Sequence, residues 1–141
     1  YYSPDLDRMK AKIAEYGLDK VIELFPWLSH KETLEYVKNS MFYLTVARYE
    51  GLPLAVIEAM SLGKAIVASD VVGNRDCVED GYNGRLLPFE KEVFLKAICE
   101  LLEDKQKREW YGENSRALFE NKFLITNRIK ELEAIYQSFC L

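Results

Sequence analysis

The sequence predicts an α/β protein in which helices flank a parallel sheet. Helical and strand-like segments alternate over roughly the first ninety residues, which is typical of chains that return through a helix after each parallel strand. Two strand-like segments are almost continuously apolar, as strands buried on both faces are. The chain has 141 residues, 49% hydrophobic and 30% charged, so we expect residues 1–141 to form one domain with its own core.

Local signals define two helices and a short strand in the first forty residues. Apolar spacing predicts a helix over residues 5–16 that ends at a glycine. A β-like run over residues 21–25 follows and stops at a proline. Ser29 and Glu32 have the spacing of a capping box, which predicts a helix from this point to about residue 39.

The middle of the chain alternates between strands and a helix. Residues 41–46 and 65–69 are the two apolar segments, and each is predicted to be a strand with both faces buried. Between them, Pro53 suits the first position of a helix over residues 54–62. A loop rich in glycine, asparagine and aspartate then leads to a short strand at residues 85–87.

The C-terminal part, from residue 92 onward, has only helical periodicity. Two apolar stripes recur at helical spacing, one made of Phe94, Leu95, Ile98, Leu101 and Leu102 and the other of Ile125, Ile129, Leu132, Tyr136 and Phe139.

Composition and charge exclude several classes of protein. There are 23 acidic and 19 basic side chains, and the net charge of -4 does not favour nucleic acid as a partner, because proteins that bind phosphates along a nucleic acid usually carry a clustered basic excess. No apolar run approaches the ~20 residues of a membrane-spanning helix. Cys77, Cys99 and Cys140 are too scattered for a disulfide framework, and with one histidine in the chain we expect no metal site. These features predict a cytoplasmic protein with reduced thiols.

The predicted topology indicates where a ligand would bind. In open α/β sheets, ligands bind beyond the carboxyl ends of the strands. Three loops follow predicted strands, at residues 26–29, 47–52 and 70–74, and we expect them to converge on one crevice.

Two glutamates carry the chemistry of this region. Glu58 is the one charged residue of the predicted helix, and a carboxylate among apolar neighbours needs a hydrogen-bonding partner, such as the hydroxyls of a ribose. Glu50 precedes the helix, whose first N–H groups could bind a phosphate or a sugar oxygen, and Gly51 permits close approach of a ligand. Two structural alternatives stay open: a core carboxylate satisfied by the protein at position 58, and a helix-capping acid at position 50.

The distance expected between the two glutamates argues against a hydrolase, in which one carboxylate acts as acid and the other as nucleophile. Eight helical residues rise ~12 Å, whereas the two carboxylates of a retaining hydrolase stand ~5–5.5 Å apart. We therefore expect Glu50 and Glu58 to contact different parts of one long ligand.

Four segments, taken in order, resemble the retaining glycosyltransferases of group 1 (family 4). Glu50 to Glu58 is similar to the E-x(7)-E motif of that family, and residues 62–70 are similar to its G-x-P-V-V-A-[ST]-D strand. Gly73 matches part of its v-G-G stretch, and residues 78–84 resemble its V-x-D-G-x-N-G turn. The resemblance extends from about residue 21 to the C-terminal helices.

The resemblance implies a Rossmann-like parallel sheet that forms the C-terminal, donor-binding half of a GT-B fold and lacks its first strands. Residues 1–141 would then be a single nucleotide-sugar-binding domain and a fragment of a longer chain. The implied catalytic residue is Glu50, which would contact the hydroxyls of the transferred sugar. The implied nucleotide-sugar-binding residues are Trp27 beside the base, the backbone of Gly51, Leu52, Pro53 and Leu54 at the sugar and distal phosphate, and Glu58 at the ribose.

The implied reaction moves a sugar from a UDP-, GDP- or ADP-sugar to a glycan, lipid or other acceptor in polysaccharide biosynthesis, with retention of configuration and without a metal or other cofactor. The partner implied within the same protein is an N-terminal acceptor domain, and the full-length enzyme would associate peripherally with the inner face of the membrane. That resemblance also implies an Arg and a Lys that grip the diphosphate and lie outside this chain, so we expect the isolated chain to be inactive.

The sequence departs from the family at Ala47, where serine is common, and at Pro26, where glycine is usual. Two other functions stay open: a different GT-B enzyme such as a sugar-nucleotide epimerase, and a non-enzymatic nucleotide-binding module of flavodoxin-like shape.

Overall fold

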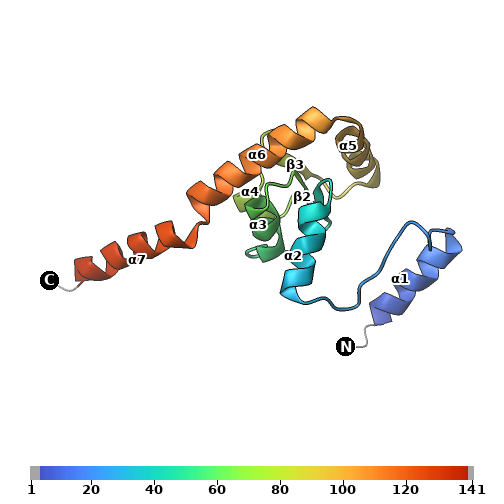
Figure 1. The fold of residues 1–141 in the computed structure, drawn as a ribbon, viewed down its shortest axis with the longest axis horizontal. Coiled ribbons are helices and arrows are strands. Elements are labelled where there is room, and N and C mark those ends of the chain that lie inside the picture. Colours follow the sequence, from blue (N-terminus) through green and yellow to red (C-terminus); the bar gives the residue numbers. More distant parts are fainter. Residues whose placement is uncertain (1–3, 140–141) are drawn as a thin grey trace. The chain divides into compact units, whose positions relative to one another are not determined.

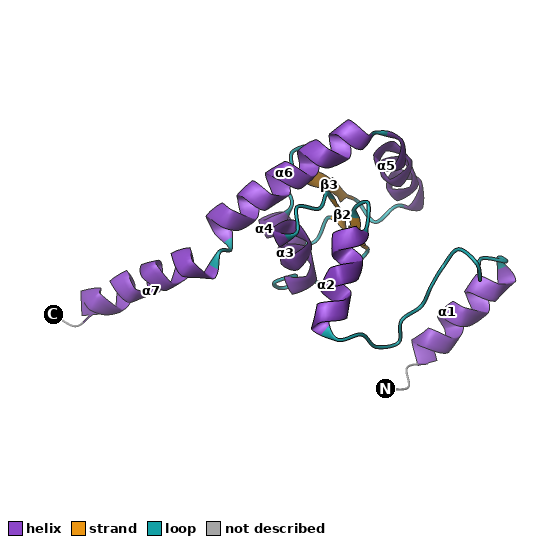
Figure 2. Ribbon diagram, viewed as in Figure 1, coloured by secondary structure: helices purple, strands orange, loops and turns teal. Residues whose placement is uncertain are grey.

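The computed structural model describes residues 4–139 and contains helices and one small sheet (Figures 1 and 2). Contacts between residues divide the chain into two compact units, Tyr1–Thr33 and Leu34–Leu141. The assignment of residues 1–141 to one nucleotide-sugar-binding domain stays a prediction.

The first unit contains helix α1 (Pro4–Glu15) and the start of helix α2 (His30–Asn39). The capping box forms as predicted: the Ser29 N–H donates to the Glu32 carboxylate at 2.9 Å, and the Glu32 N–H donates to the Ser29 hydroxyl at 3.3 Å. The Ser29 hydroxyl also donates to the Glu32 carboxylate at 2.5 Å, and this hydrogen bond, together with the one from the Ser29 N–H, lowers the pKa of Glu32.

The strand predicted over residues 21–25 is wrong, because the structure has loop and turn there. A strand needs a hydrogen-bonded neighbour, and the described part of this unit contains no other strand. Val21 is accordingly 78% exposed.

The second unit is built on a three-stranded parallel sheet in the order β1-β2-β3. Its strands are β1 (Tyr43–Thr45), β2 (Ile66–Ser69) and β3 (Gly84–Leu87). All four residues of the central strand β2 are buried, as predicted. The prediction that β1 is buried on both faces is wrong, because β1 lies at the edge of the described sheet and Leu44 is 42% exposed.

Apolar side chains fill both faces of the sheet. Ile66 and Ala68 point into a cluster with Val56, Ala59 and Met60 of helix α3 (Leu54–Ser61). Val67 points to the opposite face because successive strand residues alternate. The cluster on that face contains Phe94, Ala97 and Leu101 of helix α5 (Lys91–Glu103) and Tyr111 of helix α6 (Lys105–Lys122).

Helix α4 (Val72–Cys77) forms where the sequence predicts a loop. The Asn74 amide donates to the Ser69 carbonyl at 2.9 Å, and the Arg75 guanidinium donates to the Asp70 carboxylate at 2.6 Å. These side chains fold the segment back onto the end of β2, which hydropathy patterns do not reveal.

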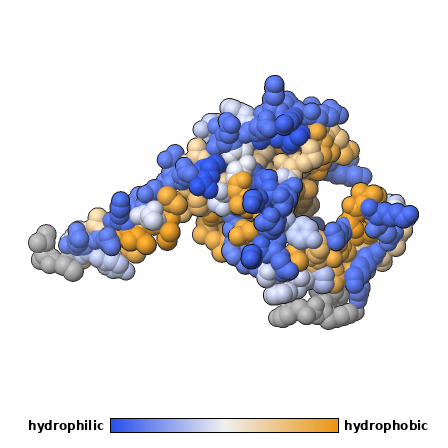
Figure 3. Space-filling view, viewed as in Figure 1, coloured by the Kyte–Doolittle hydropathy of each residue, from blue (hydrophilic) through white to orange (hydrophobic). Residues whose placement is uncertain are grey.

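Helix α7 (Ile125–Phe139) forms as predicted and has no buried residue. Its apolar stripe is visible along the helix in Figure 3, and Phe139 is 81% exposed. Within residues 4–139, no helix combines the length and apolar character that crossing a lipid bilayer requires.

Candidate functional site

Two of the three loops predicted to converge do meet, at the carboxyl ends of β1 and β2. The Ser69 hydroxyl donates to the Ala47 carbonyl at 2.5 Å, and the Gly73 N–H donates to the Glu50 carbonyl at 3.0 Å. A Cβ atom at Gly73 would lie 2.5 Å from the Gly51 carbonyl oxygen, so this approach of the two backbones requires glycine. The third loop, residues 26–29, follows no strand, so the prediction of a strand before it is wrong. This loop belongs to the first unit, and its convergence on the same crevice stays a prediction.

A cavity of about 530 Å³ lies between the two loops that meet. It combines charged side chains with apolar ones, so a ligand with both polar groups and apolar faces, such as a sugar, would suit it. The first loop contributes Arg48, Tyr49, Glu50 and Gly51 to its lining, and the second contributes Asp70, Val71, Val72 and Arg75.

The Glu50 carboxylate is partly exposed in this cavity. Helix α3 has Pro53 at its N-cap and no side-chain cap, so Glu50 does not cap this helix. Among residues 4–139, no side chain or N–H group donates a hydrogen bond to the Glu50 carboxylate. The carboxylate is therefore available to accept hydrogen bonds from a ligand.

Glu58 lies beside the buried stripe of α3 and is partly exposed. The expectation of a carboxylate enclosed by apolar neighbours is wrong, because α3 buries Val56, Ala59 and Met60 and leaves the adjacent position at the margin of the core. Burial raises the pKa of Tyr43, and the charges of Glu50 and Glu58 raise it further. Both carboxylates thus lie within electrostatic reach of one phenol.

The backbone between Gly51 and Leu54 has fewer unpaired N–H groups than the first turn of a helix usually offers. The Leu54 N–H donates to the Leu52 carbonyl at 3.0 Å, and Pro53 has no N–H. The N–H groups of Gly51 and Leu52 make no hydrogen bond with other described residues. These two amides are the backbone donors left for a ligand.

Trp27 lies in the first unit, with 78% of its side chain exposed. It does not line the cavity described within the first unit.

Three charged residues of the cavity are not among the site residues predicted from sequence: Arg48, Asp70 and Arg75. The hydrogen bond between Asp70 and Arg75 lowers the pKa of Asp70 and raises that of Arg75. The Arg48 guanidinium lies over the Phe89 ring, 5.3 Å from its centroid. Arg48 and Asp70 lie in the loops predicted to converge, and Arg75 follows directly, so the sequence placed all three near the crevice. It does not show which side chains point into the crevice.

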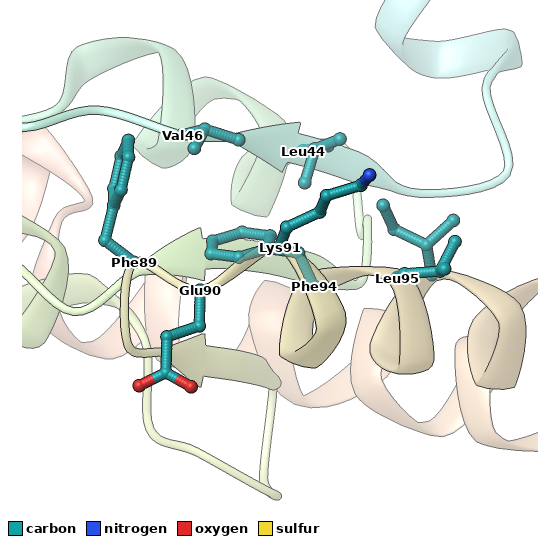
Figure 4. Close-up of a pocket in the computed structure, with 8 residues that line it drawn as sticks. Leu44, Val46, Phe89, Glu90, Lys91, Phe94 and Leu95 are labelled. Atoms are coloured by element: carbon teal, nitrogen blue, oxygen red, sulfur yellow. The ribbon is translucent and has the colours of Figure 1, made fainter.

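A second pocket, of about 510 Å³, lies between the β1 segment and α5. Figure 4 shows Leu44 and Val46 across from Phe89, Phe94 and Leu95. Few polar groups converge here, so the pocket is a packing surface rather than a place for a sugar or a phosphate. In the described part of the chain, no group of three or more His, Cys, Asp and Glu side chains could hold a metal ion.

Comparison with known proteins gives a family match and full-length relatives. The family described as glycosyl transferases group 1 matches residues 2–118. An uncharacterized glycosyltransferase of Methanocaldococcus jannaschii, MJ1069, is 33% identical over 138 residues, which are 96% of this chain and 35% of that protein. The alpha-D-kanosaminyltransferase of Streptomyces kanamyceticus is 28% identical over 139 residues, 98% of this chain and 35% of the relative. The chain therefore spans about a third of the length of these relatives.

The fold also matches solved structures. Anabaena Alr3699/HepE, solved in complex with UDP-glucose, superposes with a TM-score of 0.85 and 21% sequence identity over 94% of this chain and 36% of that protein. The parallel sheet and its flanking helices are those of a GT-B fold, of which the chain covers a fragment.

Proposed function

Because this chain belongs to the glycosyl transferases group 1, we propose that it is the donor-binding part of an enzyme that transfers a sugar from a nucleotide-sugar with retention of configuration. The observation that carries the proposal is the cavity at the carboxyl ends of β1 and β2, which Glu50 lines and where its carboxylate has no protein donor among the described residues.

Glu50 is the residue we assign to the transferred sugar. A carboxylate without a protein donor can accept hydrogen bonds from two neighbouring sugar hydroxyls and so fix the orientation of the ring. The N–H groups of Gly51 and Leu52 lie next to it in the chain and would donate to the sugar or to the distal phosphate.

Glu58 is assigned to the ribose of the nucleotide. It follows Glu50 by eight residues and is partly exposed, and both carboxylates influence Tyr43. One extended ligand could therefore contact both glutamates, with its sugar at Glu50 and its ribose at Glu58. Trp27 is assigned to the base; its large exposed side chain supports stacking.

The reaction proposed for these residues uses no protein nucleophile, metal ion or other cofactor. As the bond from the sugar to the diphosphate breaks, positive charge develops on the sugar and negative charge on the leaving group. Fixed N–H groups and charges around the diphosphate stabilise that separation because they need no reorganisation. An acceptor hydroxyl then bonds to the anomeric carbon from the face that the leaving group vacates, and its proton passes to the departing diphosphate.

UDP is the first nucleotide to test, because HepE was solved with UDP-glucose. The remainder of the full-length protein would supply the acceptor domain, and its place would be the cytoplasm, at the inner face of the membrane, where it would build a polysaccharide.

The experiment measures thermal stabilisation of the full-length protein by UDP, GDP and ADP, followed by transfer assays with the corresponding sugars. A ligand that binds only the folded state raises the unfolding temperature. We expect one nucleotide to do so and its sugar ester to be consumed when an acceptor is present. Binding without turnover would favour a nucleotide-binding module, and conversion of the donor to its epimer would favour an epimerase.

A further inference from the structure

Arg48 is a charged residue of the cavity that the proposed roles leave unused. It stands two positions before Glu50 in the loop after β1 and lines the same cavity as Glu50 and Gly51. It also lines a smaller adjoining cavity of about 340 Å³, together with Ser69, Asp70, Val71 and Phe89. Arg48 thus lines both cavities at this end of the sheet.

The charges around the cavity are not all compensated within the protein. Arg75 pairs with Asp70 at 2.6 Å, so each of these side chains already has its counter-charge. Within residues 4–139, no carboxylate forms a salt bridge with Arg48. Among the described residues, the cavity therefore presents a cation at Arg48 and an anion at Glu50 that have no counter-charge from the protein.

Arg48 is exposed, and its guanidinium lies over an aromatic ring rather than against an acid. Its guanidinium carbon lies 5.3 Å from the centroid of Phe89, which follows β3 and precedes α5. Stacking on a ring face leaves the in-plane N–H donors of a guanidinium free. These donors match two oxygens of one phosphate or carboxylate, a geometry that lysine does not offer.

We propose that Arg48 binds an anionic group of the donor, either an oxygen pair of its diphosphate or the carboxylate of an acidic sugar. This inference rests on the proposed function and adds a chemical requirement to it. A neutral sugar alone satisfies Glu50 through its hydroxyls and gives Arg48 no counter-charge. An anion beside the sugar satisfies both residues at once.

The test measures binding by calorimetry in the full-length protein that contains this chain. The variants are Arg48→Gln and, as a charge-matched control, Lys105→Gln. Lys105 is the first residue of α6. Because α5 leads back from the carboxyl end of β3, Lys105 lies toward the amino ends of the strands, away from the cavity. The ligands are the nucleoside diphosphate that binds, its glucose ester and its glucuronic acid ester.

We expect Arg48→Gln to weaken binding by about 10- to 150-fold and Lys105→Gln to leave it unchanged. A loss with all three ligands identifies the diphosphate as the anion, and a loss confined to the glucuronic acid ester identifies the sugar carboxylate. Unchanged affinity for all three overturns the inference while leaving the proposed function intact.

A protein that binds no nucleoside diphosphate before any substitution instead contradicts the proposed function itself. If Arg48→Gln does not fold, Phe89→Leu removes the ring under the guanidinium and leaves the charge. Phe89→Leu should lower the affinity for the same ligands by a smaller factor. Affinities equal to those of the unmodified protein would also overturn the inference.

Discussion

At the residue scale, the two glutamates of the site have different surroundings and should have separable roles. Glu50 lines the cavity, so it should act on the sugar as bonds change. We expect Glu50→Gln in the full-length enzyme to lower kcat about 10- to 150-fold, because weaker hydrogen bonds no longer orient the ring. Steady-state kinetics and calorimetry should give a lower kcat with unchanged affinity for the nucleoside diphosphate. Loss of that affinity instead would show that the two roles are exchanged.

Glu58 should behave in the opposite way. Glu58→Gln keeps the volume of the side chain and removes the charge that strengthens hydrogen bonds to a ribose. We expect nucleoside diphosphate affinity to fall about 10- to 150-fold, measured by calorimetry. Glu103→Gln, at the end of α5, is the matched control and should bind normally. Equal affinities for Glu58→Gln and the unmodified protein would remove Glu58 from the site.

Gly84 has a purely structural role that its surroundings make testable. A Cβ atom at Gly84 would lie 1.9 Å from the Ile66 carbonyl oxygen, inside the pairing of β2 with β3. We expect Gly84→Ala to lower the free energy of unfolding by more than about 3 kcal/mol, because backbone rather than a flexible side chain must move. Denaturant titration measures it. Gly51→Ala is the control: nothing lies within 4 Å of its Cβ position, and its stability should be unchanged.

At the element scale, the loop after β1 is held by the end of β2. The Ser69 hydroxyl donates to the Ala47 carbonyl at 2.5 Å and is itself buried. Ser69→Ala should cost about 1 kcal/mol of stability and loosen the loop that carries Glu50. We expect a severalfold lower kcat with little change in nucleotide affinity.

The control for Ser69→Ala is Ser138→Ala. This exposed hydroxyl of α7 donates only to the carbonyl of Ile135, and its removal should change neither quantity. A kcat equal in both variants would mean that the tie between Ser69 and Ala47 does not position Glu50.

The elements that sequence predicts well are those specified locally. The α2 capping box, the helix after Pro53 and the apolar run of β2 each carry their own signal. Residues 21–25 and the burial of β1 are predicted wrongly because pairing and burial depend on neighbours rather than on the segment itself. Helix α4 is missed because side-chain hydrogen bonds to the end of β2 form it.

The same limit applies to the candidate site. Glu50 and Gly51 stand out in the sequence because a carboxylate and a glycine precede a helix at the end of a strand. Arg48, Asp70 and Arg75 do not, because only the folded loops bring them to one cavity. Conversely, the apolar sequence around Glu58 predicts burial that the geometry of α3 does not produce.

At the scale of the whole molecule, the chain spans 35% of the length of MJ1069 and of the alpha-D-kanosaminyltransferase. Transfer requires a site closed around donor and acceptor, which excludes water. We expect the isolated chain to release no nucleotide from UDP-, GDP- or ADP-sugars and to bind nucleotides weakly, as measured by product chromatography and calorimetry. Turnover comparable to that of the full-length protein would mean that these residues catalyse transfer alone.

The most direct test of the account is a crystal structure of the full-length protein with a nucleotide-sugar bound. We expect the ligand in the cavity lined by residues 48–51, 70–72 and 75, with a sugar hydroxyl about 2.6–3.2 Å from the Glu50 carboxylate. A nucleotide-sugar bound elsewhere, with the Glu50 carboxylate left in solvent, would contradict the central claim.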